Sequence, residues 1–213
     1  MVKNKIFQHF FSNSKGLSFV QIGANDGVYQ DMLHWWIRKY RWRGVLVEPI
    51  AEKLAECREN YRGCGGLIFE CCAIAESPGE RDFLYAPITT VSSALVPVWA
   101  KVEGYESRGE CEHRTVPCMT IMGLIEKHYI RSVDVLCIDA EGYDGKIIKS
   151  IDFAKCRPKV IIYEYRNKGR QIPEEGELAV LFKENGYKRT RYKNNRIAYR
   201  TSIKKPWHGS HIT

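Results

Sequence analysis

Residues 17–27 read LSFVQIGANDG, an apolar run that ends in a turn containing two glycines, an asparagine and an aspartate. The run LSFVQI has the length and apolar content of a strand. Gly23 permits a sharp turn at the strand end, Asn25 tolerates left-handed backbone angles, and Gly27 has no side chain to keep a ligand from the backbone. The stretch therefore predicts a strand followed by a ligand-binding loop, although a purely structural turn would give the same pattern.

Short apolar runs alternate with amphipathic segments along the rest of the chain, which is typical of βαβ units and a mostly parallel sheet. Further strands are predicted at 44–48, 67–74, 113–118, 133–139 and 159–165. Helices are predicted at 32–40, 50–61, 119–129, 145–151 and 174–185. A hairpin of 186–193 and 195–200 closes the chain, joined by Asn194 and Asn195, a residue type that suits a tight turn. The pattern predicts an α/β fold.

The length of 213 residues and a composition of 44% hydrophobic and 27% charged residues predict a single domain over 1–213. No stretch approaches the roughly 18 apolar residues of a membrane span, and the N-terminus lacks signal-peptide features, so we expect a soluble, cytoplasmic protein. Residues 1–16 form an N-terminal helix or extension, 75–118 a long insertion that shapes the substrate site, and 204–213 a tail. The sequence leaves open whether the chain is one domain of a longer protein.

A net charge of +8 is compatible with an acidic partner, but the basic residues are spread along the chain. The densest runs are RKYRWR at 38–43 and YKRTRYKNNR at 187–196. The first is expected on a turn away from the ligand edge of the sheet. The second is expected in an edge hairpin, whose charges protect it from pairing. A nucleic-acid-binding module would need cations and stacking aromatics around one groove, so a nucleic-acid partner is not expected.

The eight cysteines form no CxxC pair and have no histidines at zinc-finger spacing. We therefore expect reduced structural thiols rather than a metal site or a disulfide framework. Cys71, Cys72 and Cys137 lie in strand-like runs, where a thiol behaves as a small hydrophobic group.

Polar residues follow three of the predicted strands, at the edge where ligands bind in an open parallel sheet. GANDG follows the strand at 17–22, Glu48 ends the strand at 44–48, and DAEG (139–142) lies at the end of the strand at 133–139. Glu48 is suited to accept both hydroxyls of a ribose, or else to cap the helix from Ile50. Asp26 would repel a pyrophosphate, and the spacing is G-x-N-x-G rather than G-x-G-x-x-G. A nucleoside ligand without dominant phosphates is favoured over the dinucleotide of an NAD-dependent oxidoreductase.

In order and spacing, FVQIGANDG, VEP and VLCIDAEGYD resemble the FkbM family of S-adenosylmethionine-dependent methyltransferases, over about residues 17–165. The resemblance implies a Rossmann-like class I methyltransferase fold: a mostly parallel seven-stranded sheet with an antiparallel last strand and helices on both faces. It also implies methylation of a hydroxyl oxygen, commonly on a sugar. The chain departs from the family at Cys137, where lysine is frequent, and at Tyr143, where a small residue is common. Both departures concern the substrate side.

By position, the resemblance also implies the residues that bind the methyl donor. The methionine end would be lined by Gly23, Ala24, Asn25, Asp26 and Gly27. Glu48 would bind the ribose, Cys72 and Ala73 would lie near the adenine, and Asp139 would orient the donor. Carboxylates near the donor are physically reasonable because its sulfonium is positively charged.

A hydroxyl must lose its proton as it attacks the methyl group, either to a general base or with the help of a metal. Asp139 and Glu164 are expected side by side at neighbouring strand ends, with Glu141 close by. We expect Asp139 to be the base or a Mg²⁺ ligand, supported by Glu141 and Glu164; Asp139 and Glu164 would ligate the metal. Alternatively, Glu141 caps the following helix and Asp139 only orients the donor.

The acceptor is predicted to be a carbohydrate or glycoconjugate, with a deoxyhexose such as rhamnose suggested by the family resemblance. Candidate substrate contacts are Ser92, Ser93, His113 and Tyr143, and candidate stacking aromatics are Tyr85, Trp99, Tyr105 and Tyr143. An RNA or other small-molecule methyltransferase is the alternative within this enzyme class. A basic nucleic-acid-binding module is the alternative outside it.

Overall fold

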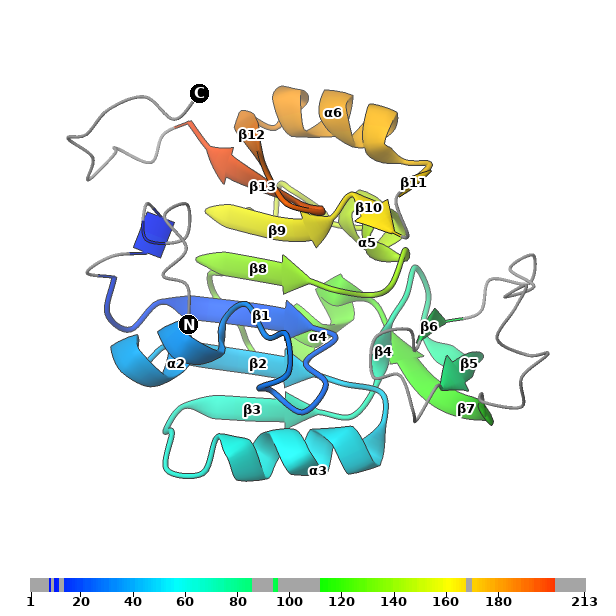
Figure 1. Ribbon diagram of the computed structural model, residues 1–213. Helices are drawn as coiled ribbons and strands as arrows, with labels where there is room; N and C mark the ends of the chain where they lie inside the picture. Colours follow the sequence, from blue (N-terminus) through cyan, green and yellow to red (C-terminus); the bar gives the residue numbers. More distant parts are fainter. Residues whose placement is uncertain are drawn as a thin grey trace.

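The computed structural model describes residues 8, 10–11, 14–85, 94–95, 112–167 and 170–201. Its centre is a seven-stranded sheet with the order β12-β13-β9-β8-β1-β2-β3 (Figure 1). The strands are β1 (Ser18–Ile22), β2 (Arg43–Val47), β3 (Leu67–Glu70), β8 (Val135–Ile138), β9 (Val160–Glu164), β12 (Tyr187–Tyr192) and β13 (Asn195–Arg200). Neighbours from β3 to β9 pair in parallel, whereas β13 is antiparallel to both β9 and β12. The predicted sheet is confirmed.

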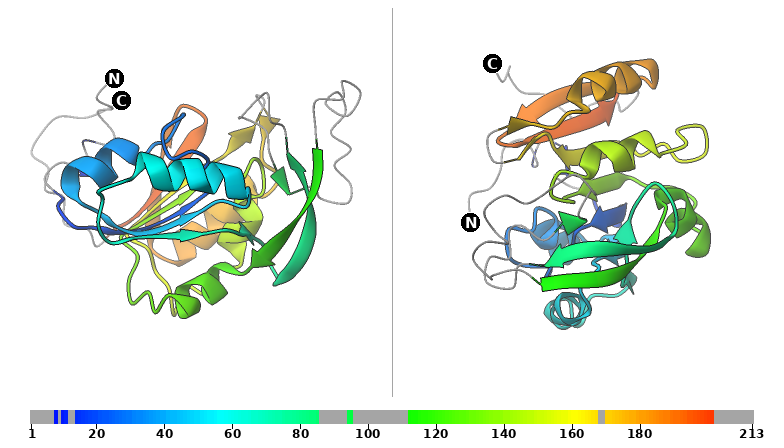
Figure 2. Two further views of the ribbon diagram at one scale, coloured as in Figure 1. Left: turned by 90° about the horizontal axis from the view of Figure 1, so that it is seen from below. Right: turned by 90° about the vertical axis from the view of Figure 1, so that its right-hand side faces the viewer.

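Helices cover both faces of this sheet (Figure 2). One face carries α2 (His34–Tyr40) and α3 (Ala51–Asn60). The other carries α4 (Ile121–Lys127), α5 (Asp144–Lys149) and α6 (Glu175–Glu184). Each of these helices begins and ends within two residues of its predicted bounds. The helical periodicity of the sequence was therefore sufficient to locate them.

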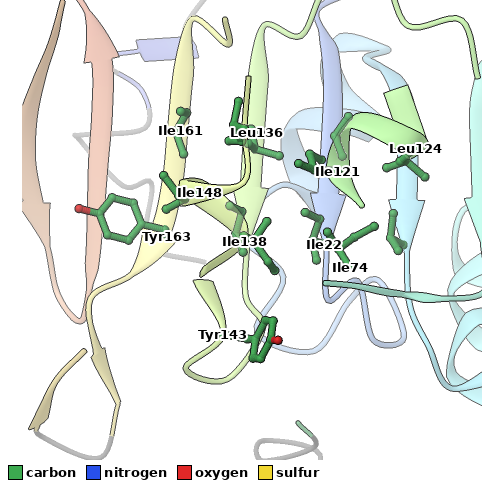
Figure 3. Close-up of a cluster of buried hydrophobic side chains, with 14 of the residues drawn as sticks. Ile22, Ile74, Ile121, Leu124, Leu136, Ile138, Tyr143, Ile148, Ile161 and Tyr163 are labelled. Carbon is green, nitrogen blue, oxygen red and sulfur yellow. The ribbon is translucent and has the colours of Figure 1, made fainter. Parts of the chain in front are cut away.

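The strand β8 shows how the core is divided between the two faces. All four of its residues are buried. Leu136 and Ile138 pack toward α4 and α5, beside Ile148 (Figure 3), whereas Val135 and Cys137 belong to the cluster on the α2 and α3 side. Alternate residues of a strand point to opposite faces, so a strand covered on both sides must be apolar throughout. Each fully buried isoleucine or leucine contributes about 1.5–3 kcal/mol.

A second sheet lies beyond the carboxyl ends of the central strands (Figure 1). It consists of β4 (Ala73–Ile74), β5 (Gly79–Tyr85), β6 (Ala94–Leu95) and β7 (Glu112–Met119), in the order β4-β7-β5-β6. Most of it comes from the predicted insertion at 75–118. A short pair, β10 (Arg166–Asn167) and β11 (Arg170–Gln171), follows β9.

The prediction of one strand over 67–74 was wrong, because this run is divided between the two sheets. Of this run, only Leu67–Glu70 pairs with β2, and Glu70 accepts hydrogen bonds from Lys127 at 2.8 Å and His128 at 2.7 Å. The chain then leaves the central sheet, and Ala73 and Ile74 pair with β7. Cys71 is consequently exposed rather than packed inside a strand.

The closing hairpin forms, but its turn lies one residue earlier than predicted. Tyr192 pairs with Asn195, so Lys193 and Asn194 form the two-residue loop. Lys193 takes the left-handed conformation with φ 51°, and Asn195 already pairs with Glu164 of β9. Pairing with β9 therefore sets the register. As predicted, β12 is an edge strand of the sheet. The basic run 38–43 spans the connection from α2 to β2, away from the carboxyl ends of the strands, which is also as predicted.

None of the helices in the described ranges is long and apolar enough to cross a membrane.

Candidate active site at the carboxyl ends of the strands

A cleft opens at the carboxyl ends of β1, β2 and β8, where the second sheet faces them. It encloses about 1090 Å³, including the part that is open to solvent. β1 pairs with β2 on one side and with β8 on the other, so the cleft lies where the strand order reverses. Predicted site residues in its wall are Gly23, Ala24, Asn25, Glu48, Cys72, Ala73, Asp139, Glu141 and Tyr143. Segments far apart in the sequence are thus brought to one site.

The loop after β1 is held against both neighbouring strands. The N–H groups of Gly23 and Ala24 donate hydrogen bonds to the carbonyl of Val47, each at 3.0 Å. Gly23 has φ +76°, and a Cβ there would lie 2.0 Å from the carbonyl oxygen of Asp139. Asn25 adopts the predicted left-handed conformation, with φ 48°. Glycine is required at position 23 both for this backbone angle and for the close approach of β8.

Glu48 fixes this loop from the end of β2. Its Oε2 accepts a hydrogen bond from the N–H of Asn25 at 2.9 Å, and its Oε1 accepts one from the N–H of Ile50 at 3.1 Å. Burial raises the pKa of Glu48 to about 7, an effect that these hydrogen bonds and the charge of Lys53 only partly offset. A carboxylate has about four acceptor positions, so two remain for hydroxyl groups of a ligand. The Glu48 carboxylate can therefore cap the helix start and still bind a ligand in the cleft.

Two aspartates lie on the opposite side of the loop. Asp139 lines the cleft and is exposed on that side, while protein atoms surround it on the others. This surrounding protein raises the pKa of Asp139, and the negative charge of the nearby Asp31 raises it further. Asp31 also lines the cleft, and sequence reasoning missed it. Its Oδ1 accepts hydrogen bonds from the N–H groups of Leu33 at 2.6 Å and His34 at 2.8 Å. An aspartate just before a helix is an N-cap signal that could have identified it.

The wall of the cleft is consequently acidic. It contains the carboxylates of Asp31, Glu48, Asp139 and Glu141. Lys53 is the cation among the described wall residues, and it is paired with Glu56 at 2.9 Å. Such a site favours a positively charged ligand and disfavours phosphates.

Asp144 positions the loop that carries Asp139 and Glu141. It is fully buried at the start of α5. Its Oδ2 accepts a hydrogen bond from the N–H of Ala140 at 3.0 Å, and its Oδ1 accepts one from the N–H of Glu164 at 2.8 Å. Burial raises the pKa of Asp144 well above its ordinary value, and the charge of Asp139 adds to this. The sequence motif contains this residue, but nothing in its position alone indicated that it ties the end of β8 to the end of β9.

The side of the cleft formed by the second sheet carries aromatic side chains. Phe83 and Tyr85 of β5 line the cleft, as does Tyr143 after β8. The Tyr143 hydroxyl donates a hydrogen bond to the carboxylate of Glu76, and the Lys146 ammonium lies 4.5 Å from the centre of its ring. Tyr85 and Tyr143 thus lie where the predicted stacking aromatics were expected. The other candidates, Ser92, Ser93, Trp99 and Tyr105, lie outside the described residues.

The structure does not place Asp26 or Gly27 in the wall of the cleft. Asp26 closes the turn instead, since its Oδ1 accepts hydrogen bonds from the N–H groups of Val28 at 2.8 Å and Tyr29 at 2.7 Å. A Cβ on Gly27 would lie 2.7 Å from the Tyr61 ring and 2.8 Å from the sulfur of Cys57. The missing side chain at Gly27 therefore allows packing against α3, and not the approach of a ligand as predicted.

Glu164 and His113 also lie outside the wall. Asp139 and Glu164 follow Ile138 and Tyr163, which are paired in the sheet, so they occupy neighbouring strand ends as predicted. His113 pairs with Leu84 within the second sheet. Within the described part of the chain, no three histidine, cysteine, aspartate or glutamate side chains are grouped to hold a metal. The described residues therefore give no support to the Mg²⁺ site considered from the sequence.

The comparisons with solved structures give the same fold. Methyltransferase FkbM from Methylobacillus flagellatus KT matches with a TM-score of 0.55 and 11% identity over 86% of this chain, and the chain spans only 43% of that one. A methyltransferase from Geobacter sulfurreducens matches with a TM-score of 0.52 and 12% identity, over 95% of this chain and 81% of that one. The METTL16 MTase domain matches with a TM-score of 0.51 and 10% identity, over 92% of this chain and 65% of that one. At these identities the likeness shows the fold alone, that of a class I methyltransferase.

The sequence comparison is more specific. No curated protein was found to match the chain. The family model described as the methyltransferase FkbM domain matches residues 21–189, which include β2, β3, β8 and β9 and all the described residues of the cleft wall. The resemblance stated from the sequence motifs is confirmed, and with it the class of enzyme. The chain therefore belongs to the methyltransferase FkbM domain family.

Proposed function

We propose that this methyltransferase domain transfers a methyl group from S-adenosylmethionine to a hydroxyl group of a carbohydrate or glycoconjugate. The observation that carries the proposal is the acidic cleft at the point where the strand order reverses, lined by Asp31, Glu48, Asp139 and Glu141. Carboxylates attract a sulfonium and repel a pyrophosphate, so the cleft suits this donor better than NAD.

Each part of the donor has suitable protein groups in the cleft. The free acceptor positions of Glu48 would bind the ribose hydroxyls, while its existing hydrogen bonds hold the loop at Asn25. Gly23, Ala24 and Asn25 would line the methionine end. Cys72 and Ala73 are buried and apolar, which suits contact with the flat adenine.

Asp139 is the proposed general base. When bound, S-adenosylmethionine would supply an electrophilic methyl group to the acceptor oxygen, with S-adenosylhomocysteine as the leaving group. Asp139 takes the proton that the hydroxyl loses. Burial and the charge of Asp31 raise the pKa of Asp139 in the donor-free protein. A nearby sulfonium would offset part of this rise and keep the carboxylate ionised, ready to accept a proton. Glu141 would support it from the same loop, and Asp144 would hold that loop in place.

The carbohydrate acceptor is supported by the family resemblance and by the aromatic wall of Phe83, Tyr85 and Tyr143. Rhamnose or another deoxyhexose is the first acceptor to try. An RNA acceptor is less well supported, because single-stranded nucleic acid needs several cations beside its stacking aromatics. Among the described wall residues the single cation is Lys53, and it already forms an ion pair with Glu56.

The single domain over 1–213 and the cytoplasmic location also stay proposals. The seven cysteines in the described residues are free thiols, as expected in a reducing compartment.

The test is transfer of labelled methyl from S-adenosylmethionine to a panel of deoxyhexose-containing glycans, other glycans and short RNAs. We expect incorporation into a glycan, and loss of about 10²–10⁴ in rate for Asp139→Asn with donor binding retained. Asp82→Asn, an exposed carboxylate outside the cleft wall, is the matched control and should keep full activity. Incorporation into RNA but into no glycan would refute the carbohydrate acceptor. Full activity of Asp139→Asn would refute the base.

A further inference from the structure

A second pocket lies at the edge of the sheet opposite the cleft, where β8 and β9 begin and β13 ends (Figure 1). It encloses about 650 Å³, including the part open to solvent. Asp134 precedes β8 and Asp139 follows it, so at about 3.3 Å per residue the two sites are separated by about 16 Å along the strand. Nothing in the proposed methyl transfer uses this pocket.

The pocket is lined by many more cations than carboxylates. The cationic residues are Arg131, Lys155, Arg157, Lys159 and Arg200, and the carboxylate is Asp134. Both oxygens of Asp134 have partners: Oδ1 pairs with Lys159 at 2.6 Å, and Oδ2 accepts hydrogen bonds from the N–H and the hydroxyl of Ser18 at 2.8 and 3.0 Å. It neutralises Lys159 and leaves the other four cations of the lining uncompensated within the pocket.

These four cations have few partners of their own. Lys155 lies 3.6 Å from Asp152 in an exposed pair, which is a weak interaction. Arg157 is exposed and donates from one Nη to the carbonyl of Asn185. The Nε of Arg200 is buried and has no hydrogen-bond partner among the described residues. A buried donor without a partner is costly, so a bound acceptor here would be favourable.

We propose that this pocket binds a phosphate group, as free phosphate or as a phosphomonoester, through Arg131, Arg157 and Arg200 with Lys155 beside them. Arginine N–H groups form paired, charge-assisted hydrogen bonds with phosphate oxygens, and three arginines lie in this lining. The lining contains no tyrosine, tryptophan or phenylalanine among the described residues, so it offers no surface on which nucleic-acid bases could stack. A compact phosphate is therefore favoured over a single-stranded nucleic acid.

The experiment is an NMR titration of the full chain with inorganic phosphate and with glycerol phosphate, at constant ionic strength. We expect saturable shifts at the amides of residues 131–134, Cys156, Arg157 and Lys159, and not at the cleft. The double variant Arg131→Gln/Lys155→Gln should weaken binding at least tenfold. The matched control Arg62→Gln/Lys188→Gln removes the same charge from exposed positions outside the pocket and should change the affinity less than twofold.

Several results would overturn the proposal. The proposal fails if the amide shifts do not saturate with phosphate, or if they occur at residues outside the pocket. It also fails if the two double variants weaken phosphate binding equally, because that would indicate a general effect of charge. Tight, strongly salt-dependent binding of a short RNA without phosphate binding would overturn it in favour of nucleic acid. Because the amide shifts are read on the unmodified protein, the result does not depend on how the variants fold. It is equally independent of whether the cleft binds S-adenosylmethionine, which is titrated separately.

Discussion

The Glu48 carboxylate accepts a hydrogen bond from the main-chain N–H of Asn25, with 2.9 Å between the nitrogen and Oε2. The end of β2 thereby fixes the loop after β1. The same carboxylate is proposed to bind the donor's ribose, and burial raises its pKa to about 7. Protonation of one side chain should therefore affect both the donor site and the stability of the protein.

Donor affinity should fall as the pH decreases below about 7. The charged form of Glu48 is the better acceptor for two hydroxyls, so each pH unit below its pKa should weaken binding by up to about tenfold. Calorimetric titration of S-adenosylmethionine between pH 5.5 and 8 measures this. Glu48→Gln should bind weakly with a much flatter profile, and a flat profile for the unmodified protein would contradict the role of Glu48.

The unliganded protein should lose stability as the pH rises. The pKa of Glu48 is about 7 in the folded chain against an ordinary 4.5, so folding favours its protonated form. That stability is present below about pH 4.5 and is lost as the pH rises to about 7. The loss is on the order of 3 kcal/mol. Asp31 and Asp139 also have raised pKa values and act in the same direction.

Urea unfolding between pH 5 and 8 checks this prediction. Glu70 and Asp134 have lowered pKa values, and their stabilisation is lost only at lower pH, outside this window. Glu48→Gln should show a shallower decline than the unmodified protein. Parallel pH profiles for the two proteins would show that Glu48 is not the cause.

Gly27→Ala should destabilise the protein more than Gly63→Ala. Both glycines have positive φ, 74° and 82°, so both substitutions carry backbone strain of about 1–2 kcal/mol. At Gly63 nothing lies within 4 Å of the added Cβ, whereas at Gly27 it meets Tyr61 and Cys57 of the packed α3 side. The steric contact should add about 1–3 kcal/mol, measured as the difference in unfolding free energy. Equal losses would contradict the packing role of Gly27.

Gly27 also illustrates how far the sequence alone could lead. The alternation of apolar runs and helical patterns predicts the sheet, its helices and the edge at which ligands bind. It cannot tell which face of a loop meets the ligand, because that depends on the packing of residues distant in sequence. Gly27 and Asp26 were therefore assigned to the donor site although they face α3 and the turn.

Asp31 and the run 67–74 show the same limit. Asp31 lies at the cleft with its Oδ2 accepting a hydrogen bond from the Gln21 side chain of β1 at 3.0 Å, a contact that the capping pattern alone does not reveal. The division of 67–74 depends on pairing with β7, more than forty residues further along the chain. The local sequence pattern predicts the local backbone conformation. The position of Asp31 and the division of 67–74 depend instead on contacts with residues outside the local stretch of sequence.

Asp144→Ala should reduce both stability and the rate of methyl transfer. It removes the acceptor of two partly buried N–H groups, those of Ala140 and Glu164, at a cost of about 2–4 kcal/mol in unfolding free energy. Loosening the loop should lower kcat more than it changes donor affinity, because Asp139 sits on that loop whereas Glu48 does not. Asp82→Ala, at an exposed site, is the control. An unchanged kcat with reduced stability would leave Asp144 a purely structural role.

The most direct test of the central claim, that the acidic cleft binds S-adenosylmethionine, is calorimetric titration of the protein with this donor and with NAD. We predict one-to-one binding of S-adenosylmethionine, no binding of NAD, and loss of binding in Gly23→Ala, whose Cβ would lie 2.0 Å from the carbonyl oxygen of Asp139. A circular dichroism spectrum of that variant would separate a damaged site from a damaged fold. Absence of S-adenosylmethionine binding up to about 1 mM, corresponding to less than about 4 kcal/mol of affinity, would contradict the claim.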